Sequence, residues 1–345
     1  MELTAKSRVA ILLQDGIKGV HGKTGLAFLR YSPAQIVAVI DSATAGESLV
    51  KLTQIEREVP IVNSTQAALA YQPDTILIGI APSGGKLPTK LESEIAIAIK
   101  AGLSVINGLH TPLQPLFPAR PPGQEIWDIR QEPSGLRIGK GQAQQLTDAR
   151  ILTVGTDMAV GKMSTSLELH RAAIAQGLKA KFVATGQAGI AIAGQGIALD
   201  AVRVDFAAGA VEKTVLEQGK EQELIIIEGQ GSLLHPGSTA TLPLIRGSQP
   251  TGLILVHRAG AKHIRDLPDF VIPPLPEVIQ LYETVASAAS KGVKVKVKAI
   301  ALNTSGFDQT EAEAIISLTS EQTGLPCSDV VRYGGAALLS AIYSE

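Results

Sequence analysis

Short apolar runs alternate with stretches of helical periodicity in the first half of the chain. The apolar runs are RVAILLQ, QIVAVID, TILIGI and LSVINGL, and the helical stretch KLESEIAIAIKAG separates the last two. Strands that alternate with helices predict a parallel sheet that is covered by helices on both faces. We therefore expect an α/β, Rossmann-like domain over residues 1–110.

A second α/β series begins near residue 150. Its predicted strands are ILTVG, KAKFVATG, ELIIIEG, TGLILVHR and VKVKAIALN, and its predicted helices include MSTSLELHRAAIAQG and GAVEKTVLEQG. Between the two series, six prolines from Pro112 to Pro133 exclude a continuous helix or a central strand. The pattern predicts a Pro-rich connection over residues 111–149 and a second parallel-sheet domain over residues 150–345.

Composition narrows the class of partner. The chain has 31 basic and 32 acidic residues and a formal net charge of −1, so it lacks the electrostatic footprint of a nucleic-acid or membrane-surface protein. The single cysteine, Cys327, cannot form an internal disulfide, and the N-terminus does not resemble a signal peptide. We expect a cytoplasmic homo-oligomer that binds a small molecule, with no nucleic-acid or membrane partner.

The stretch ILTVGTDMAVGKMST at residues 151–165 has the order of a phosphate-binding strand, loop and helix. In such loops glycines let backbone N–H groups converge on an anion, and a lysine and the helix N-terminus supply positive charge. Five residues separate the first glycine from Gly-Lys, one more than the usual Walker pattern allows. The residues expected to bind the cofactor are Gly155, Thr156, Asp157, Val160, Gly161, Lys162, Met163, Ser164 and Thr165.

A metal requirement stays open at this loop. Met163 occupies the position after Lys162 where a magnesium-binding hydroxyl is usual, although Ser164 and Thr165 follow at once and either hydroxyl could turn toward an ion. Glu228 ends the apolar run LIII, where P-loop proteins place an acidic residue that holds magnesium or its water. Ser164 and Glu228 are therefore the candidate metal ligands if magnesium is used.

A second glycine-lysine loop, GIKGVHGKT at residues 16–24, follows the first predicted strand with the same spacing. Its strand ends near Gln14, and the helix after it is short because Pro33 follows. We favour the loop at residues 155–165 as the phosphate site. Lys23 and Thr24 fit a solvated turn and helix cap as well as a ligand contact.

Polar or glycine residues follow the predicted strands of the second domain, and ligands in open parallel sheets bind beyond the carboxyl ends of the strands. A carboxylate at a buried strand tip is costly unless partnered, which favours a functional role for Glu228. His235 and His257 fit a structural histidine as well as a proton-transfer group. The other candidate ligand contacts at strand ends are Gln187, Gly229, Gln230, Arg258 and Asn303.

Several motifs resemble known families. GTDMAVGK resembles the expanded loop of dethiobiotin synthetase, and Asn303 is similar to the adenine-contacting position of that group. Over nearly the whole chain, GKTGLAFLRY, GIAPSGGKLP, NGLH, GTDMAVGKMST, ATGQAGI, IIIEGQGS, HRAG and ALNTSG resemble the two-domain P-loop family of formerly unknown function that is now associated with D-glutamate N-acetyltransferase. The resemblance implies a Rossmann-like domain, a P-loop domain, and transfer of acetyl from acetyl-CoA to an amino acid nitrogen.

That reaction suggests roles for the candidates. Lys162 and the loop amides would grip the phosphates of acetyl-CoA, the cosubstrate. The acceptor amine must lose a proton, for which Glu228 is the first candidate base and His235 the second. Backbone amides of the loop or near Gly229 could stabilise the oxyanion, and Arg258 could hold a substrate carboxylate.

Three alternatives remain. An ATP-dependent ligase or kinase of the dethiobiotin synthetase type would use ATP and magnesium at the same loop. An NAD-binding protein would use residues 16–25 and Asp41, but the glycine spacing is not the dinucleotide fingerprint, so NAD is not favoured. A nucleotide-sensing protein would bind without turnover. The loop SGGKLP at residues 83–88 is a further candidate contact for the diphosphate of CoA.

Overall fold

The computed structural model describes residues 1, 3–82, 87–118, 120–290 and 292–343. The chain forms two compact units. The first unit contains residues 1–132 and 187–201, and the second contains residues 133–186 and 202–345. The predicted Pro-rich connection is thus divided between the units, and a segment from within the predicted second domain belongs to the first. Residues 83–86 of the SGGKLP loop lie outside the described residues.

The first unit has a six-stranded parallel sheet in the order β3-β2-β1-β4-β5-β6, which is the doubly wound order of a Rossmann-like domain. β6 is an edge strand, so it is compatible with the prolines around it. The strands are β1 (Arg8–Leu12), β2 (Gln35–Ile40), β3 (Ile61–Val62), β4 (Thr75–Ile78), β5 (Ser104–Asn107) and β6 (Ile126–Asp128).

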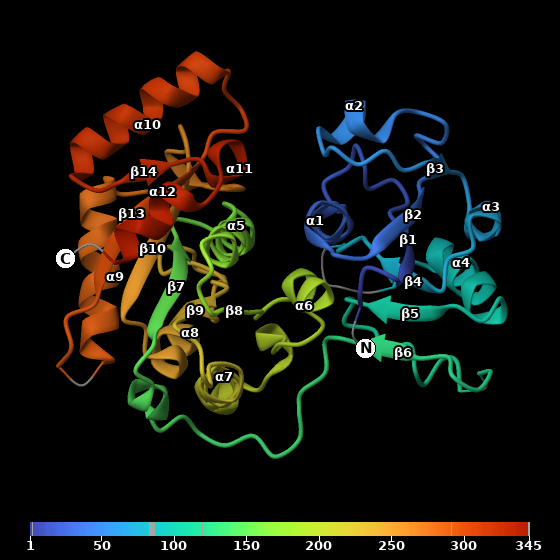
Figure 1. The fold of residues 1–345 in the computed structure, drawn as a ribbon, viewed down its shortest axis with the longest axis horizontal. Helices are drawn as coiled ribbons and strands as arrows, with labels where there is room; N and C mark the ends of the chain where they lie inside the picture. The colour runs from blue at the N-terminus through green and yellow to red at the C-terminus, as the bar shows by residue number, and fades with distance from the viewer. Residues whose placement is uncertain (2, 83–86, 119, 291, 344–345) are drawn as a thin grey trace. The chain divides into compact units, whose positions relative to one another are not determined.

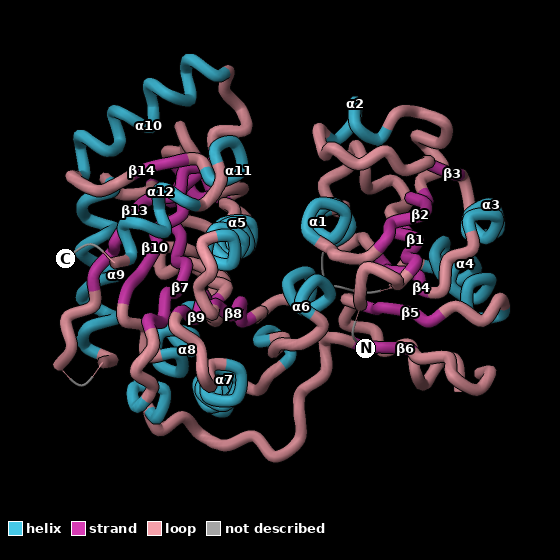
Figure 2. Tube along the Cα trace, viewed as in Figure 1, coloured by secondary structure: helices cyan, strands magenta, loops and turns pink. Residues whose placement is uncertain are grey.

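Helices cover both faces of this sheet (Figure 2). β1 and β4 are buried along most of their length, as expected for strands that are covered on both sides. The elements are α1 (Lys23–Tyr31), α2 (Leu49–Thr53), α3 (Thr65–Ala68), η1 (Leu69–Tyr71), α4 (Thr89–Lys100), α6 (Gln187–Ala193) and η4 (Leu199–Ala201).

The second unit has its own six-stranded parallel sheet in the order β14-β13-β10-β7-β9-β8 (Figure 1). β7 lies inside the sheet between β9 and β10, so the loop that follows it emerges among the other strand ends. The strands are β7 (Ala149–Gly155), β8 (Ala180–Val183), β9 (Leu224–Ile227), β10 (Gly252–Arg258), β13 (Lys296–Asn303) and β14 (Cys327–Ser328), and β11 (His263–Ile264) pairs with β12 (Leu267–Val271) as a separate antiparallel hairpin.

Helices of the second unit pack an apolar core against this sheet. α5 and α12 contribute Leu169, Ala173 and Leu338 to a cluster with the buried faces of β7, β9, β10 and β13. The elements are η3 (Gln142–Gln145), α5 (Lys162–Ala175), α7 (Val204–Gln218), α8 (Thr241–Ser248), α9 (Leu275–Ala288), α10 (Gln309–Thr323), α11 (Val330–Tyr333) and α12 (Ala336–Ile342).

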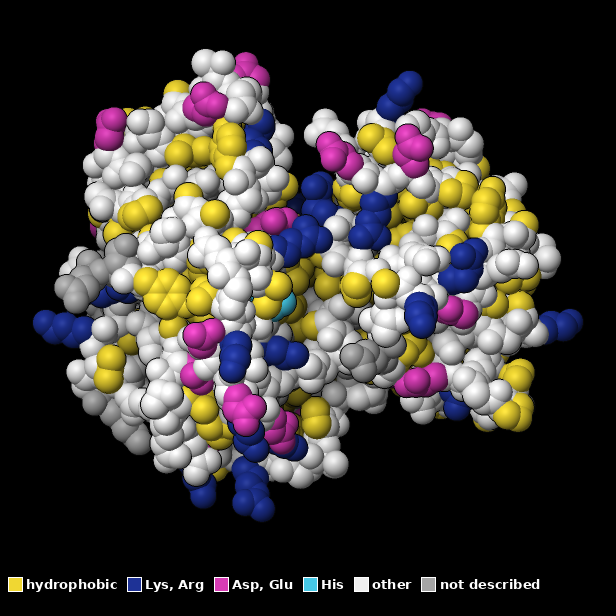
Figure 3. All heavy atoms as spheres, in the orientation of Figure 1, with side chains coloured by type: hydrophobic (Ala, Val, Ile, Leu, Met, Phe, Trp, Pro, Cys, Tyr) yellow, Lys and Arg dark blue, Asp and Glu magenta, His cyan; other side chains and the backbone are white. Residues whose placement is uncertain are grey.

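The α/β fold class and the strands and helices predicted from the sequence are confirmed. On the visible surface, basic and acidic side chains are interspersed (Figure 3), in keeping with the near-zero net charge. Among the described residues, no helix has both the length and the apolar character needed to cross a bilayer.

Candidate functional site

The strand-loop-helix segment predicted at residues 151–165 is present in the second unit. β7 ends at Gly155 and α5 begins at Lys162. The loop between them turns through two residues with positive φ, Ala159 at 56° and Gly161 at 120°. The first N–H groups of a helix have no partner within the helix, and α5 has no side-chain cap and no acidic residue in its first turn. These donors suit an anion.

Lys162 is buried at the base of the loop. It is only 6% exposed, and its Nζ donates to the carbonyl oxygen of Asp157 at 2.7 Å. A Cβ at Gly155 would lie 3.0 Å from that Nζ, so glycine leaves room for the ammonium. Burial lowers the pKa of Lys162 to about 8, against the opposing effect of the Asp157 and Glu228 carboxylates.

The carboxylate of Asp157 holds the loop in shape. Oδ1 accepts from the N–H of Met158 at 2.6 Å, and Oδ2 accepts from the N–H of Arg265 at 2.7 Å. Arg265 lies in the turn between β11 and β12. The hairpin of β11 and β12 is therefore tied through a buried carboxylate to the loop between Gly155 and Lys162, which we call the P-loop. The sequence did not predict this contact.

Glu228 directly follows β9 and is 2% exposed. Its Oε2 accepts from the N–H groups of Thr185 at 2.8 Å and Gly186 at 3.1 Å. Its Oε1 accepts from Nε2 of Gln230 at 3.0 Å. Burial raises the pKa of Glu228 to about 7, although these donors and the Lys162 charge oppose the rise. The carboxyl therefore changes charge near neutral pH.

Gly229 brings the end of β9 close to β7 and to the lysine. A Cβ at this position would lie 1.7 Å from the carbonyl oxygen of Thr153 and 3.0 Å from Cδ of Lys162. The N–H of Gly229 donates to Oγ1 of Thr153 at 2.9 Å, and that hydroxyl lies 3.0 Å from Oγ of Ser166 in α5. The Gly229 amide is therefore already engaged, which leaves the P-loop amides as the candidates for oxyanion stabilisation.

Tyr282 was not identified from the sequence. It lies in α9 and is fully buried, and its hydroxyl donates to the carbonyl oxygen of Gly155 at 2.7 Å. The same hydroxyl accepts from the N–H of Leu233 at 3.0 Å. Tyr282 thus links the start of the P-loop to the segment after β9.

The two histidines differ in their environments. Nδ1 of His257 lies 2.9 Å from Oγ1 of Thr156, and burial lowers its pKa to about 4, so this imidazole is neutral at physiological pH. His235 accepts from the N–H of Gly237 at 3.0 Å within its own turn. Within the described residues, no hydrogen bond joins His235 to the P-loop.

Arg258 and Asn303 both reach the P-loop backbone. Nη2 of the exposed Arg258 lies 3.5 Å from the carbonyl oxygen of Ala159. Nδ2 of Asn303 donates to the carbonyl oxygen of Val160 at 3.2 Å, while its Oδ1 accepts from the N–H of Ser305 at 3.1 Å. The side-chain amide of Asn303, which was predicted to contact a nucleotide base, thus stabilises the loop backbone through Val160.

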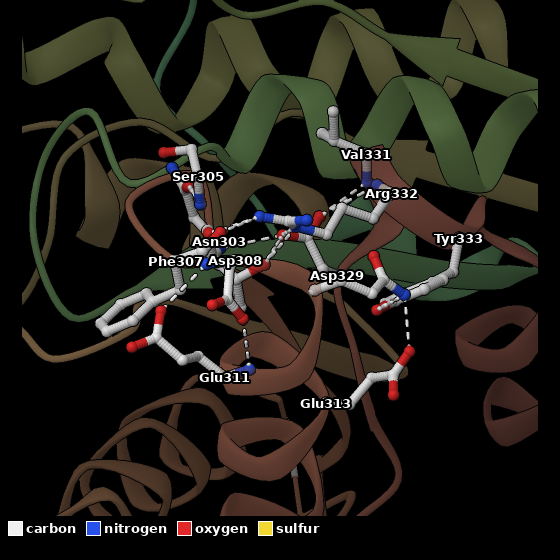
Figure 4. A network of polar contacts seen from close by, with 12 residues as sticks. Asn303, Ser305, Phe307, Asp308, Glu311, Glu313, Asp329, Val331, Arg332 and Tyr333 are labelled. Carbon is white, nitrogen blue, oxygen red and sulfur yellow. Dashed lines mark hydrogen bonds and ion pairs between the residues drawn. The ribbon is translucent and has the colours of Figure 1, made fainter.

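A polar network fixes the segment that carries Asn303 (Figure 4). Oδ2 of Asp329 accepts from the N–H of Thr304 at 2.8 Å. Arg332 donates to Oγ1 of Thr304 at 2.9 Å and to the carbonyl oxygen of Phe307. A capping box at the start of α10 holds the far end of the segment.

The remaining candidates occupy different surroundings. Met163 and Ser164 are partly exposed in the first turn of α5, whereas Thr165 is buried. Gln187 begins α6 in the first unit, where a Cβ at Gly108 would lie 3.2 Å from its Cγ. Across the described residues, no three His, Cys, Asp or Glu side chains are grouped as a metal site.

Two family models match the chain. Residues 137–339 match the P-loop domain of DUF1611, a domain of unknown function, and residues 42–132 match the Rossmann-like DUF1611_N domain. A crystal structure of a DUF1611 family protein from Anabaena variabilis is 58% identical, with a TM-score of 0.94 over 98% of this chain and 99% of that chain.

Two relatives are named D-glutamate N-acetyltransferase. The protein from Tritonibacter scottomollicae is 33% identical over 337 residues, which cover 96% of this chain and 97% of its own length. The protein from a Pseudoalteromonas species is 37% identical over 265 residues, which cover 75% of this chain and 78% of its own length.

Proposed function

We propose, from the premise that this chain belongs to the two-domain DUF1611 family, that it is an N-acetyltransferase which moves acetyl from acetyl-CoA to the amino group of D-glutamate. The names of two relatives support the reaction. The observation that carries the proposal is the P-loop, where a buried lysine and a glutamate with a pKa of about 7 lie beside an uncapped helix N-terminus.

The loop is suited to holding phosphate without cleaving it. Lys162 and the first N–H groups of α5 supply a cation and backbone donors for the phosphates of CoA. Met163 follows the lysine where ATP-hydrolysing P-loop proteins use a hydroxyl to bind magnesium. A ligand that is bound but not hydrolysed does not need that hydroxyl.

Glu228 is the proposed base. The amino group of D-glutamate attacks the thioester carbonyl only as a free amine, so its ammonium form must first lose a proton. The carboxylate of Glu228 takes that proton, a C–N bond forms, the C–S bond breaks, and the CoA thiolate leaves and is protonated. A base with a pKa near the working pH suits this step.

The P-loop amides would stabilise the oxyanion that develops on the thioester carbonyl. The exposed guanidinium of Arg258 has a long contact to the carbonyl oxygen of Ala159, which leaves donors for a carboxylate of the acceptor. Gln230, which donates to Glu228, would orient the base.

The proposal is tested by thiol release from acetyl-CoA with the purified full chain. Addition of D-glutamate should cause release of the CoA thiol. Reactions with L-glutamate and without an acceptor are run for comparison. Lys162→Ala and Glu228→Gln should each abolish most of the activity, and the exposed-site controls Lys220→Ala and Glu56→Gln should retain it. Acceptor-dependent ADP release from ATP and magnesium, without thiol release, would instead establish the ligase or kinase alternative.

A further inference from the structure

Three polar side chains converge at the C-terminal ends of β5 and β6 in the first unit. His110 follows β5, Arg130 follows β6, and Asp200 lies in η4. Oδ2 of Asp200 is 3.1 Å from Nη2 of Arg130 and 3.8 Å from Nε2 of His110. Ligands of open parallel sheets bind at this end of the strands, and the P-loop site does not use these residues.

The backbone that carries His110 is held in place. Nδ2 of Asn107 donates to Oδ1 of Asp128 at 2.8 Å and to the carbonyl oxygen of Thr111 at 2.9 Å. The Asp128 carboxylate also accepts from the N–H groups of Leu113 and Gln114. Both strand ends and the intervening loop are therefore tied together, which is the support that a binding site needs.

Arg130 has unused donor capacity. Its side chain is 11% exposed, and burial lowers its pKa while Asp200 opposes that effect. Its Nε–H is buried without a hydrogen-bond partner among the described residues, which adds to the desolvation cost of the guanidinium, so a ligand would be reached by the exposed Nη donors. A guanidinium has five N–H donors, and a carboxylate engages two of them in parallel. A ligand carboxylate at the open edge of this group would compensate part of the desolvation.

The charges of the cluster are complementary to a zwitterion. The side chains of His110 and Asp200 are each 44% exposed, so both can be reached from solution. Arg130 offers positive charge for a carboxylate, and the half-exposed carboxylate of Asp200 offers negative charge for an ammonium. An anion without an ammonium would be repelled by Asp200.

We propose that His110, Arg130 and Asp200 form a binding site for an α-amino acid, in which Arg130 and His110 hold the carboxylate and Asp200 holds the ammonium. This inference rests on the proposed function only in taking an acidic amino acid as the ligand. It assigns the recognition of a carboxylate to an arginine of the first unit, whereas Arg258 belongs to the second.

The test is calorimetric titration of the full chain with D-glutamate in the absence of acetyl-CoA. Arg130→Gln should weaken binding about tenfold or more, since it removes a charged hydrogen-bond donor. Arg8→Gln is the matched control, because Arg8 begins β1 at the opposite end of the same sheet. Loss of binding in Arg258→Gln but not in Arg130→Gln would overturn the inference.

Glutarate, which lacks the ammonium, distinguishes a ligand-binding role of Asp200 from a purely structural role of its ion pair with Arg130. Asp200→Asn should weaken D-glutamate binding and improve glutarate binding, so the preference between the two ligands reverses or disappears. If the ion pair between Asp200 and Arg130 were only structural, Asp200→Asn would lower the Tm and leave the preference between D-glutamate and glutarate unchanged. This result would contradict the site, and it can be obtained from Asp200→Asn even if Arg130→Gln does not fold. Failure of the wild type to bind either ligand would contradict it as well.

The two proposals fail separately. D-Glutamate binding that depends on Arg130, with no thiol release from acetyl-CoA, would remove the acetyltransferase proposal and leave this site. Acetyl transfer together with unchanged D-glutamate binding in Arg130→Gln would remove the site and leave the reaction.

Discussion

The Nζ atom of Lys162 lies 2.7 Å from the carbonyl oxygen of Asp157, so the P-loop lysine folds back onto its own loop. A neutral carbonyl compensates a buried ammonium only in part, as the lowering of its pKa to about 8 indicates. The site therefore holds a desolvated cation for which a phosphate is a stronger partner.

Replacing this lysine should separate binding from stability. Lys162→Met should weaken acetyl-CoA binding about 10- to 100-fold, because a hydrogen bond from a charged group is lost. The unliganded variant should be more stable at pH 7 by about 1–3 kcal/mol, because the desolvation cost of the ammonium is removed. Calorimetric titration and urea unfolding measure the two effects, and Lys220→Met controls for loss of an exposed lysine. A variant that binds acetyl-CoA normally would contradict the assigned site.

Glu228 should make stability depend on pH. Its pKa is about 7 in the folded chain against an ordinary 4.5, so between these values the folded state holds a proton that the unfolded state has released. The stabilisation is complete below the ordinary value and is lost as the pH rises through about 7. Relative to Glu228→Gln, the wild type should lose about 1–3 kcal/mol of unfolding free energy between pH 4 and pH 8.

Urea unfolding at both pH values measures this difference. The exposed-site variant Glu56→Gln should follow the wild type. Parallel pH dependence in the wild type and Glu228→Gln would show that this carboxyl does not titrate near neutral pH.

Glu228 and Lys162 should together determine the pH dependence of acetyl transfer. kcat/KM for acetyl-CoA should rise as Glu228 ionises near pH 7 and fall as Lys162 loses its proton above about 8. Because the groups interact, the two limbs report the pair rather than either residue alone. The profile is measured by thiol release, and the residual activity of Glu228→Gln should lack the acidic limb. An acidic limb that persists in this variant would assign the base to another residue.

Met163 should determine how the loop responds to magnesium. Met163→Thr restores the hydroxyl that P-loop proteins use to hold the metal, so it should gain magnesium-dependent affinity for ATP, whereas wild-type binding of acetyl-CoA should not require the metal. Titrations with and without magnesium measure the effect. Met158→Thr, at an exposed position of the same loop, is the control. If ATP binding by the wild type depended strongly on magnesium, the ligase or kinase alternative would be favoured.

Much of the candidate site could be predicted because its signals are local. An apolar run followed by Gly155 and an amphipathic helix identifies the P-loop, and an apolar run that ends in a carboxylate identifies Glu228. Asn303 also ends a strand, and its contact with the P-loop is consistent with the predicted position at a strand end. In a parallel sheet, residues at successive strand ends converge whatever their separation along the chain.

The features that could not be predicted depend on long-range contacts. Nothing in the sequence LPEVIQLYETVASA distinguishes Tyr282 from an ordinary buried residue of an amphipathic helix, because its partners Gly155 and Leu233 lie far away in the chain. The bond from the Arg265 N–H to Asp157 has no side-chain signature at residue 265. The placement of Gln187 in the first unit depends on the packing of α6 with α1.

Tyr282 should act by positioning the loop. Tyr282→Phe removes one hydroxyl and leaves the buried Gly155 carbonyl and the partly buried Leu233 N–H without their partner. The expected loss in unfolding free energy is about 1–3 kcal/mol. Because Gly155 begins the P-loop, KM for acetyl-CoA should rise, whereas kcat should change little because the tyrosine donates no proton to the reacting atoms.

Urea unfolding and thiol-release kinetics separate these two effects. Tyr71→Phe, on the surface of the first unit, controls for loss of an exposed phenol. A large fall in kcat with an unchanged KM would show that Tyr282 takes part in the chemical step. Breaking both hydrogen bonds of a fully buried hydroxyl must cost free energy. If Tyr282→Phe changed neither the free energy of unfolding nor KM, the proposed link between the P-loop and the segment after β9 would be wrong.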